Sequence, residues 1–267
     1  MGSPSDSNGL LYAGVDVGSI SCEAIILDSH GLRLAAEAAP TGARSRAAAA
    51  ATLRSALAQA GFGADRLAAV VATGYGRDRV EPHTATRTEI ACHARGIAAH
   101  FPQTRLLLDV GGQDAKAILV QEGRVLDFAM NDRCAAGTGR FFEVMARALE
   151  VDLDDLGPLA LESTRRLALS SMCTVFAESE VVGMLAREER PADIAAALCR
   201  SAAERVARMA ERLGRAAPVA LSGGTARNVG FVAAVEHCLG SPVLVPEQPE
   251  FVGALGAALI GLEMQTA

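Results

Sequence analysis

The sequence of 267 residues lacks several features that would assign it to common classes of protein. Tryptophan is absent, tyrosine occurs only twice, and no apolar run reaches the roughly eighteen residues that a membrane span requires. The net charge of −6 excludes the basic surface of a nucleic-acid-binding protein. The first residues are polar and do not resemble a signal peptide. We therefore expect a cytoplasmic protein, with a disordered leader at residues 1–9, that binds neither nucleic acid nor membrane.

Three common motifs are also missing. The sequence contains neither the P-loop motif nor the Gly-x-Gly-x-x-Gly motif, which excludes P-loop and Rossmann nucleotide sites. It has no Cys-x-x-Cys, although it has six cysteines. In a reducing compartment these cysteines indicate metal, redox or buried thiols rather than disulfides. Half of the residues are hydrophobic, which is enough to bury the core of one large domain or of two closely packed lobes.

An internal repeat indicates how the chain is organised. Asp16-Val17-Gly18-Ser19 and Asp109-Val110-Gly111-Gly112 lie 93 positions apart, and an Ala-Ile pair recurs at the same offset after each. An apolar run precedes each acidic-glycine turn, and Gly31 or Gly123 follows the second apolar run. Each copy therefore predicts three strands joined by two turns.

The rest of the chain is expected to be mostly helical. Helices are predicted at Ala47–Gln59, Thr86–His100, Phe141–Leu149, Val175–Leu185, Ile194–Leu213 and Gly253–Leu259, with another after Gly224 and a short strand at Pro218–Leu221. This pattern predicts a mixed α/β protein with two related lobes. Paired lobes usually bind ligands in the cleft between them.

Three glycine-rich turns that follow predicted strands are candidate phosphate sites. They are Asp16–Ser19, Asp109–Gln113 and Ser222–Thr225. Backbone N–H groups in such turns form a nest for anions. The aspartates would repel phosphate unless Mg²⁺ lies between them, so Asp16 and Asp109 are predicted to hold Mg²⁺ through water. Gln113 is predicted to orient an attacking water. One Asp-x-Gly turn alone would more often be structural, but two matched copies favour a nucleotide site.

Two cysteines stand just before predicted helices. At Cys134 and Cys173 the partial positive charge of the helix N-terminus would favour a thiolate and a nearby anionic cluster. A [4Fe–4S] cluster needs four thiolates, which a two-fold dimer would supply. From spacing alone, ordinary buried cysteines remain the more frequent explanation. The remaining cysteines, Cys22, Cys92, Cys199 and Cys238, are expected to be structural, and His83 and His93 to lie in the core or on a helix surface.

The turns resemble those of the acetate-and-sugar-kinase, actin and heat-shock ATPase superfold, in which duplicated lobes supply two phosphate loops. The resemblance assigns Asp16, Gly18 and Ser19 to the first loop, Asp109, Gly111, Gly112, Gln113 and Lys116 to the second, and Ser222, Gly223 and Gly224 to the adenosine loop. It implies lobe I at 10–104 plus 250–267, and lobe II, with both cluster cysteines, at 105–249.

Longer stretches resemble the activators of 2-hydroxyacyl-CoA dehydratases, in the family that includes the ATPase subunits of benzoyl-CoA reductase. The stretches are Gly14–Ser19, Ala72–Arg77, Asp109–Lys116, Asn131–Phe141, Cys173–Val181 and Gly253–Leu259. The resemblance covers about residues 11–262. The intact Gly-Gly-Gln-Asp-Ala-Lys stretch looks more like a dehydratase activator than a reductase subunit.

This resemblance implies a homodimeric ATPase with one [4Fe–4S] cluster bridging the subunits through Cys134 and Cys173. A ferredoxin or flavodoxin would reduce the cluster. Binding and hydrolysis of ATP to ADP, with Mg²⁺, would change the angle between the subunits. One electron would then pass to a 2-hydroxyacyl-CoA dehydratase or a related reductase.

The first phosphate loop departs from the family pattern. The family usually has a small hydroxyl residue after the serine and a lysine three positions later, where this chain has Ile20 and Glu23. These changes remove a donor and reverse a charge. Two alternatives stay open: a small-molecule kinase of the same superfold, which would need a general-base aspartate, and a non-catalytic nucleotide-dependent scaffold.

Overall fold

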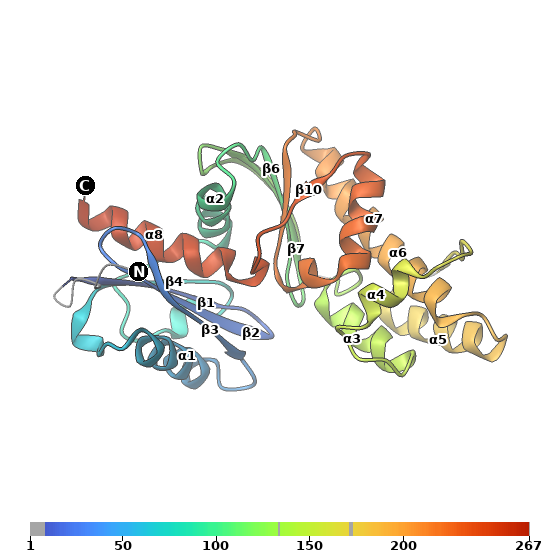
Figure 1. Ribbon diagram of the computed structural model, residues 1–267, viewed down its shortest axis with the longest axis horizontal. Helices are drawn as coiled ribbons and strands as arrows, with labels where there is room; N and C mark the ends of the chain where they lie inside the picture. The colour runs from blue at the N-terminus through green and yellow to red at the C-terminus, as the bar shows by residue number, and fades with distance from the viewer. Residues whose placement is uncertain (1–8, 133, 171–172, 267) are drawn as a thin grey trace, which may run out of the picture. The chain divides into compact units, whose positions relative to one another are not determined.

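The computed structural model describes residues 9–132, 134–170 and 173–266 (Figure 1), so the expected leader lies outside the described residues except for Gly9. The chain divides into two compact units, Met1–His100 with Phe251–Ala267 (unit 1) and Phe101–Glu250 (unit 2). Across the described residues, none of the helices combines the length and the apolar character that crossing a membrane would need.

Unit 1 is built on a five-stranded sheet in the order β3-β2-β1-β4-β5. Its strands are β1 (Leu11–Val17), β2 (Ser21–Leu27), β3 (Arg33–Pro40), β4 (Leu67–Thr73) and β5 (Ala85–Thr86). The helices are α1 (Ser45–Ala60), α2 (Glu89–His100) and α8 (Val252–Thr266), with 3-10 turns η1 (Ala64–Arg66), η2 (Arg77–Arg79) and, at the junction of the units, η4 (Pro249–Phe251). Strands β1, β2 and β3 pair with one another in antiparallel fashion, whereas β4 runs parallel to β1 and to β5.

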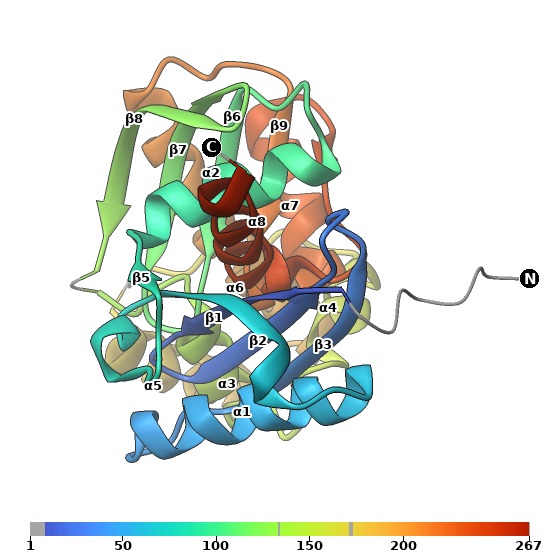
Figure 2. The same cartoon turned by 90° about the vertical axis from the view of Figure 1, so that its left-hand side faces the viewer.

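Unit 2 repeats this topology. Its sheet has the order β10-β9-β6-β7-β8, and Figure 2 shows β8 at its edge. The strands are β6 (Leu106–Val110), β7 (Ala115–Gln121), β8 (Arg124–Asn131), β9 (Val219–Ser222) and β10 (Val243–Leu244). The helices are α3 (Gly139–Ala148), α4 (Leu156–Leu161), α5 (Thr174–Ala186), α6 (Pro191–Arg212) and α7 (Val229–Leu239), with the 3-10 turn η3 (Gly224–Arg227).

The predicted repeat of three strands is confirmed, because β1–β3 and β6–β8 pair in the same way. One prediction needs correction: the helix expected at Thr86–His100 begins at Glu89, since Thr86 belongs to β5. The helix predicted at Val175–Leu185 is present as α5, on which Val175 and Val182 are exposed.

The alternation of side chains along β1 separates the two faces of the unit 1 sheet. Leu11, Ala13 and Val15 belong to one buried cluster with residues of α1, whereas Tyr12 packs with residues of α8. In Figure 1, α1 and α8 lie on opposite faces of this sheet. Asp16 has the same parity as Tyr12, so its carboxylate points to the α8 face.

Close packing of α2 on α8 depends on two glycines. A Cβ atom on Gly256 would lie 1.7 Å from the carbonyl oxygen of Cys92, and one on Gly96 would lie 2.0 Å from the carbonyl oxygen of Val252. This contact brings His93, on α2, next to Gly253 at the start of α8, and both lie beside Asp16. The helix pair therefore shapes the surroundings of the first acidic turn.

We expect Gly256→Ala to lower the free energy of unfolding by about 1–3 kcal/mol, because the added methyl group forces the helix backbones apart. Chemical denaturation measures the effect. Gly183→Ala on α5 is the matched control, since the nearest atom to its Cβ is the flexible Arg187 guanidinium at 3.6 Å. Equal stabilities of Gly256→Ala and the unaltered protein would contradict the close packing described here.

Candidate functional site

The first acidic turn joins β1 to β2 in unit 1. The N–H of Gly18 donates to the carbonyl oxygen of Ser21 at 2.9 Å, which closes a tight turn, and Ser19 at its tip is exposed. Asp16 is buried at the end of β1. A Cβ on Gly74, which has a φ of 84°, would lie 2.3 Å from Asp16 Oδ1, so the loop after β4 closes directly over this carboxylate.

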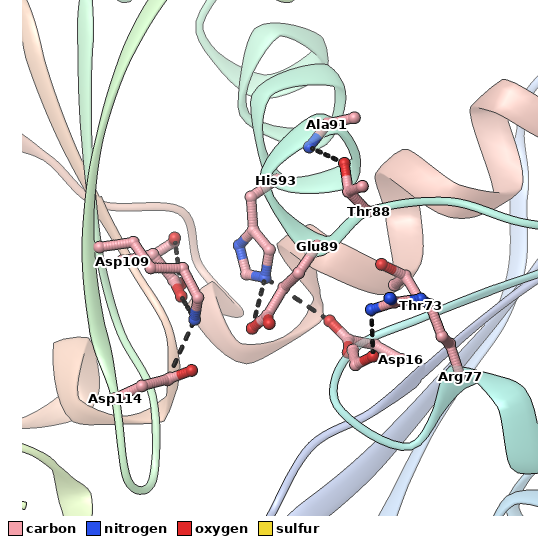
Figure 3. A network of polar contacts seen from close by, with 12 residues as sticks. Asp16, Thr73, Arg77, Thr88, Glu89, Ala91, His93, Asp109 and Asp114 are labelled. Atoms are coloured by element: carbon pink, nitrogen blue, oxygen red, sulfur yellow. Dashed lines mark hydrogen bonds and ion pairs between the residues drawn. The ribbon is translucent and has the colours of Figure 1, made fainter. Parts of the chain in front are cut away.

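A histidine joins this turn from α2. His93 Nε2 lies 3.5 Å from Asp16 Oδ2 and 4.0 Å from Glu89 Oε1 (Figure 3). His93 was expected to be a core or surface residue, and it is indeed buried, but beside an acidic turn. The sequence signal that pairs His93 with a carboxylate is its spacing from Glu89, because residues four apart share one face of a helix.

The second acidic turn, in unit 2, contains a buried ion-pair network. Lys116 Nζ lies 3.1 Å from Asp109 Oδ2 and 3.0 Å from Asp114 Oδ1. Ser222 Oγ donates to Asp109 Oδ1 at 2.7 Å. Lys116, Asp109 and Ser222 are all buried. The ammonium of Lys116, predicted from sequence to bind the nucleotide, is thus held among the carboxylates of its own loop, while Gln113 at the tip of the turn is exposed.

The third glycine turn lies beside the second because β9 runs parallel to β6, with Ser222 in register with Asp109. Gly223 has a φ of 85°, and its Cβ would lie 2.3 Å from the carbonyl oxygen of Val110. No atom lies within 4 Å of a Cβ built on Gly224. The loop therefore packs against β6 at Gly223 and leaves space at Gly224.

The start of α3 is hydrogen-bonded to the second acidic turn. Gly139 N donates to the carbonyl oxygen of Gly111 at 2.9 Å, and Arg140 N donates to that of Gly112 at 2.8 Å. The hydroxyl of the buried Thr138 lies 2.6 Å from the carbonyl oxygen of Ala135 and 3.0 Å from that of Gly112, so its one proton is shared between these two acceptors. Cys134 is half-buried just ahead of this helix. The segment that carries Cys134 is thereby tied to the predicted phosphate loop.

Cys173 is exposed and is the residue immediately before α5, as its sequence context predicted. The carboxylate of Glu180 accepts hydrogen bonds from Ser170 N at 2.9 and 3.0 Å and from Ser170 Oγ at 3.0 Å. These bonds fasten Ser170 onto α5. Within unit 2, α5 also packs against α3.

A buried carboxylate on α6 holds the earlier part of the same segment. Asp193 Oδ1 accepts hydrogen bonds from Ser163 Oγ at 2.9 Å, Thr164 N at 2.8 Å and Arg165 N at 2.9 Å. The bond from Arg165 N, with those from Thr164 N and Ser163, holds the pKa of Asp193 below its usual range despite burial. The chain approaching Cys173 is therefore anchored by Asp193 and then by Glu180.

The other cysteines have different surroundings. Burial raises the pKa of Cys22, Cys92 and Cys199 to about 12 and also raises the pKa of the half-buried Cys238. At pH 8, about one in ten thousand thiols with a pKa near 12 is ionised. These residues fit the expected structural role, because the thiolate is the metal ligand and the nucleophile.

We expect iodoacetamide at pH 8 to modify Cys173 and Cys134 in the folded, metal-free protein well before Cys22, Cys92 and Cys199. Cys173 is exposed and Cys134 is half-buried, whereas full burial and raised pKa values protect the other three thiols. Mass spectrometry of peptides from a time course measures the order, and the urea-unfolded protein is the control. Modification of Cys199 as fast as Cys173 in the folded protein would contradict this prediction.

Comparison with known proteins adds to this geometry. The 2-hydroxyisocaproyl-CoA dehydratase activator of Clostridioides difficile is 46% identical over 177 residues, which make up 66% of this chain and 66% of that protein. The aligned part thus spans slightly less than two thirds of that relative. The crystal structure of component A of (R)-2-hydroxyglutaryl-CoA dehydratase from Acidaminococcus fermentans matches with a TM-score of 0.93 at 39% identity, covering 97% of this chain and 100% of that chain.

Two further structures concern the nucleotide and the fold. The Clostridium difficile activator of 2-hydroxyisocaproyl-CoA dehydratase, solved with bound ADPNP, matches with a TM-score of 0.92 at 38% identity over 96% of each chain. A ROK family glucokinase from Streptomyces griseus matches with a TM-score of 0.60 at 15% identity over 95% of this chain and 99% of that chain, which shows the shared fold alone. The predicted superfold of sugar kinases, actin and heat-shock ATPases is confirmed. Residues 13–261 match a single family model, and the chain belongs to the BadF/BadG/BcrA/BcrD ATPase family.

Proposed function

We propose that this protein is an ATP-driven electron carrier that activates a 2-hydroxyacyl-CoA dehydratase or a related reductase. The observation that carries the proposal is the hydrogen bonding of the start of α3 to Gly111 and Gly112. It links a predicted phosphate loop to the segment of a candidate cluster cysteine. The relatives named above that are called activators of 2-hydroxyisocaproyl-CoA dehydratase support the same role.

The two candidate cluster ligands fit a shared [4Fe–4S] cluster. Cys134 and Cys173 precede α3 and α5 along the chain, and neither is buried in the core. One chain would supply two thiolates of the four that the cluster requires, so two copies related by a two-fold axis would complete it. The cluster would store one electron at low potential, received from a ferredoxin or flavodoxin. The residues of this chain would orient both thiols through the anchored segments before α3 and α5.

The acidic turns fit a nucleotide with Mg²⁺. The N–H groups of Gly18 and Gly111 close the two turns, and the backbone N–H groups of Ser19 and Gly112 that follow them would meet phosphate. Asp16 and Asp109 are oxygen donors suited to Mg²⁺, which would offset the phosphate charge. The loop of Ser222, Gly223 and Gly224 would receive the adenosine, with space at Gly224. Exposed Gln113 would orient the water that attacks ATP.

The local bonding also suggests how ATP would act on the cluster. Any shift of the second turn on binding or hydrolysis would move the carbonyl oxygens of Gly111 and Gly112, to which Thr138, Gly139 and Arg140 are bonded. The start of α3 would follow, and Cys134 with it. Such coupling needs an element with two conformations whose populations the nucleotide shifts, and the second acidic turn would be that element. The likeness to glucokinase, at 15% identity, supports no kinase activity.

We expect Cys134→Ser and Cys173→Ser each to abolish cluster binding after anaerobic purification, because each removes two of the four thiolates of a dimer. Iron analysis and visible absorbance measure the loss, and the unaltered protein should hold about four irons per dimer. Cys199→Ser is the control, since Cys199 is buried elsewhere in unit 2. Full iron content in either of the first two variants would disprove the ligand assignment.

We expect Thr138→Val to keep the cluster but to weaken its response to the nucleotide, because the change removes the hydroxyl bonded to Gly112. In the unaltered protein, MgADP and Mg-ADPNP should give different cluster spectra and different rates of iron chelation. The ratio of the two rates should move toward one in the variant, by roughly fivefold for a hydrogen bond of about 1 kcal/mol.

The same substitution at Thr52 is the control for this experiment. Thr52 is also buried, but its hydroxyl donates to Ala48 within α1 of unit 1. The Thr52→Val protein should keep the full nucleotide response. If Thr138→Val and Thr52→Val respond alike, with nucleotide binding confirmed, the contact between Thr138 and Gly112 does not transmit the signal.

A further inference from the structure

The side chain of Asn131, the last residue of β8, makes a contact that the proposed function does not use. Its amide nitrogen Nδ2 donates a hydrogen bond to the carbonyl oxygen of Cys134 at 3.0 Å. Only the NH₂ end of the amide can make this contact, because the amide oxygen is an acceptor and cannot donate to another carbonyl oxygen. Both residues are half-buried. The bond therefore reaches the backbone of a candidate cluster ligand directly.

Strand pairing fixes the backbone of Asn131 at the base of the second acidic turn. In the register of β8 with β7, Asn131 stands opposite Ala115, and in the register of β7 with β6, Ala115 stands opposite Val110. These three residues form one row across the sheet, and Gly111, the next residue after Val110, belongs to the turn. The short side chain of Asn131 thus reaches Cys134 from a backbone position that the sheet holds in place.

The carbonyl groups of the two candidate ligands are held by different donors. The carbonyl oxygen of Cys173 accepts a hydrogen bond from Ala177 N at 2.8 Å, as expected for the residue just before α5. For Cys134 the corresponding N–H is that of Thr138, which donates to a later carbonyl oxygen, because α3 begins only at residue 139. Asn131 gives Cys134 the donor that the helix itself gives Cys173.

The chain after Cys134 is bonded to the same turn as the sheet before it. The N–H groups of Gly139 and Arg140, at the start of α3, donate to carbonyl oxygens of the second acidic turn at 2.9 and 2.8 Å. Cys134 therefore lies between these bonds and the bond from Asn131. Hydrogen bonds to the residue that carries a metal ligand set the direction of that ligand, and a loop without them would let the thiol turn away.

We propose that Asn131 is a positioning residue for the thiolate of Cys134. The inference rests on the cluster-binding function proposed above. By holding the carbonyl group of Cys134, the amide fixes the torsion angle ψ of this residue, and with it the direction in which the Cα–Cβ bond leaves the backbone. Asn131 acts through Cys134 and is not itself a ligand.

Two substitutions separate the hydrogen-bond donor from the shape of the side chain. Asn131→Asp is nearly isosteric but, once ionised, has no proton to donate, and Asn131→Ala removes the side chain. In the anaerobically loaded homodimer, we expect each variant to lose iron to a chelator about fivefold faster than the unaltered protein, the factor that one ordinary hydrogen bond gives. The visible spectrum of the cluster should shift in both. Asn131→Gln, which keeps the amide on a longer arm, should restore part of the difference.

The cluster-free protein provides a second readout, which keeps the test valid if a variant takes up no iron. Iodoacetamide should modify Cys134 about fivefold faster in Asn131→Ala than in the unaltered protein, because the loop is released. The exposed Cys173 of the same molecule should react at an unchanged rate. Mass spectrometry of the two peptides measures both rates.

Asp127→Ala is the matched control. Asp127 is exposed on the same face of β8 as Asn131, and its carboxylate accepts a hydrogen bond from the neighbouring Phe128 N at 2.8 Å. This variant should match the unaltered protein in iron release and in the alkylation of Cys134.

Three results would count against the proposal in different ways. Equal iron release and equal alkylation of Cys134 in the unaltered protein, Asn131→Asp and Asn131→Ala would overturn the role of Asn131 and leave the cluster assignment intact. Faster alkylation of Cys173 together with Cys134 would also overturn it, since a general loosening of unit 2 would then be the cause. An unaltered protein that binds no iron would instead overturn the proposed function, and this inference with it.

Discussion

The buried ion pair between Lys116 and Asp109 is the interaction on which much of unit 2 depends. A charged side chain without solvent is tolerated only when partners compensate it, and here Asp109 and Asp114 do so from the same turn. Because the pair spans the register of β6 and β7, it fixes the shape of the turn between them. The carbonyl groups of that turn then receive the first N–H groups of α3. The sheet, the second acidic turn and the helix after Cys134 are consequently joined by hydrogen bonds.

The two units share one duplicated scaffold but surround their acidic turns with different charged groups. Both sheets have the same strand order and the same tight turn after the first strand, closed by Gly18 in one unit and by Gly111 in the other. Their surroundings diverge, because unit 1 packs α2 and α8 through Gly96 and Gly256 and so brings His93 to Asp16. Unit 2 instead extends into helices that carry the two candidate cluster cysteines. Duplication explains the common backbone geometry of the two turns. The side chains around the turns differ between the two units.

Membership of the BadF/BadG/BcrA/BcrD ATPase family and the likeness to the dehydratase activators agree with this division of roles. The fold alone would not decide function, since a glucokinase shares it. In unit 2, Cys134 and Cys173 precede α3 and α5 and both lie outside the buried core, in the same unit as the second and third glycine turns. Glu180 and Asp193 accept hydrogen bonds from Ser170 and Arg165, which precede Cys173 in the chain.

The sequence by itself determined the local features: the two copies of three strands, the glycine turns, and the position of Cys134 and Cys173 ahead of helices. These follow from alternation, glycine and short-range pattern, which neighbouring residues specify. Strand β4, the approach of His93 to Asp16, and the burial of Lys116 between carboxylates were not predicted. The approach of His93 to Asp16 depends on residues far apart in the chain, as Glu89–His100 packs on the C-terminal helix. Lys116 meets carboxylates only two and seven residues away, and the surrounding fold decides that this group is buried. Tertiary packing decided them, because a side chain's partners, and hence its charge environment, are set by contacts that local pattern does not encode.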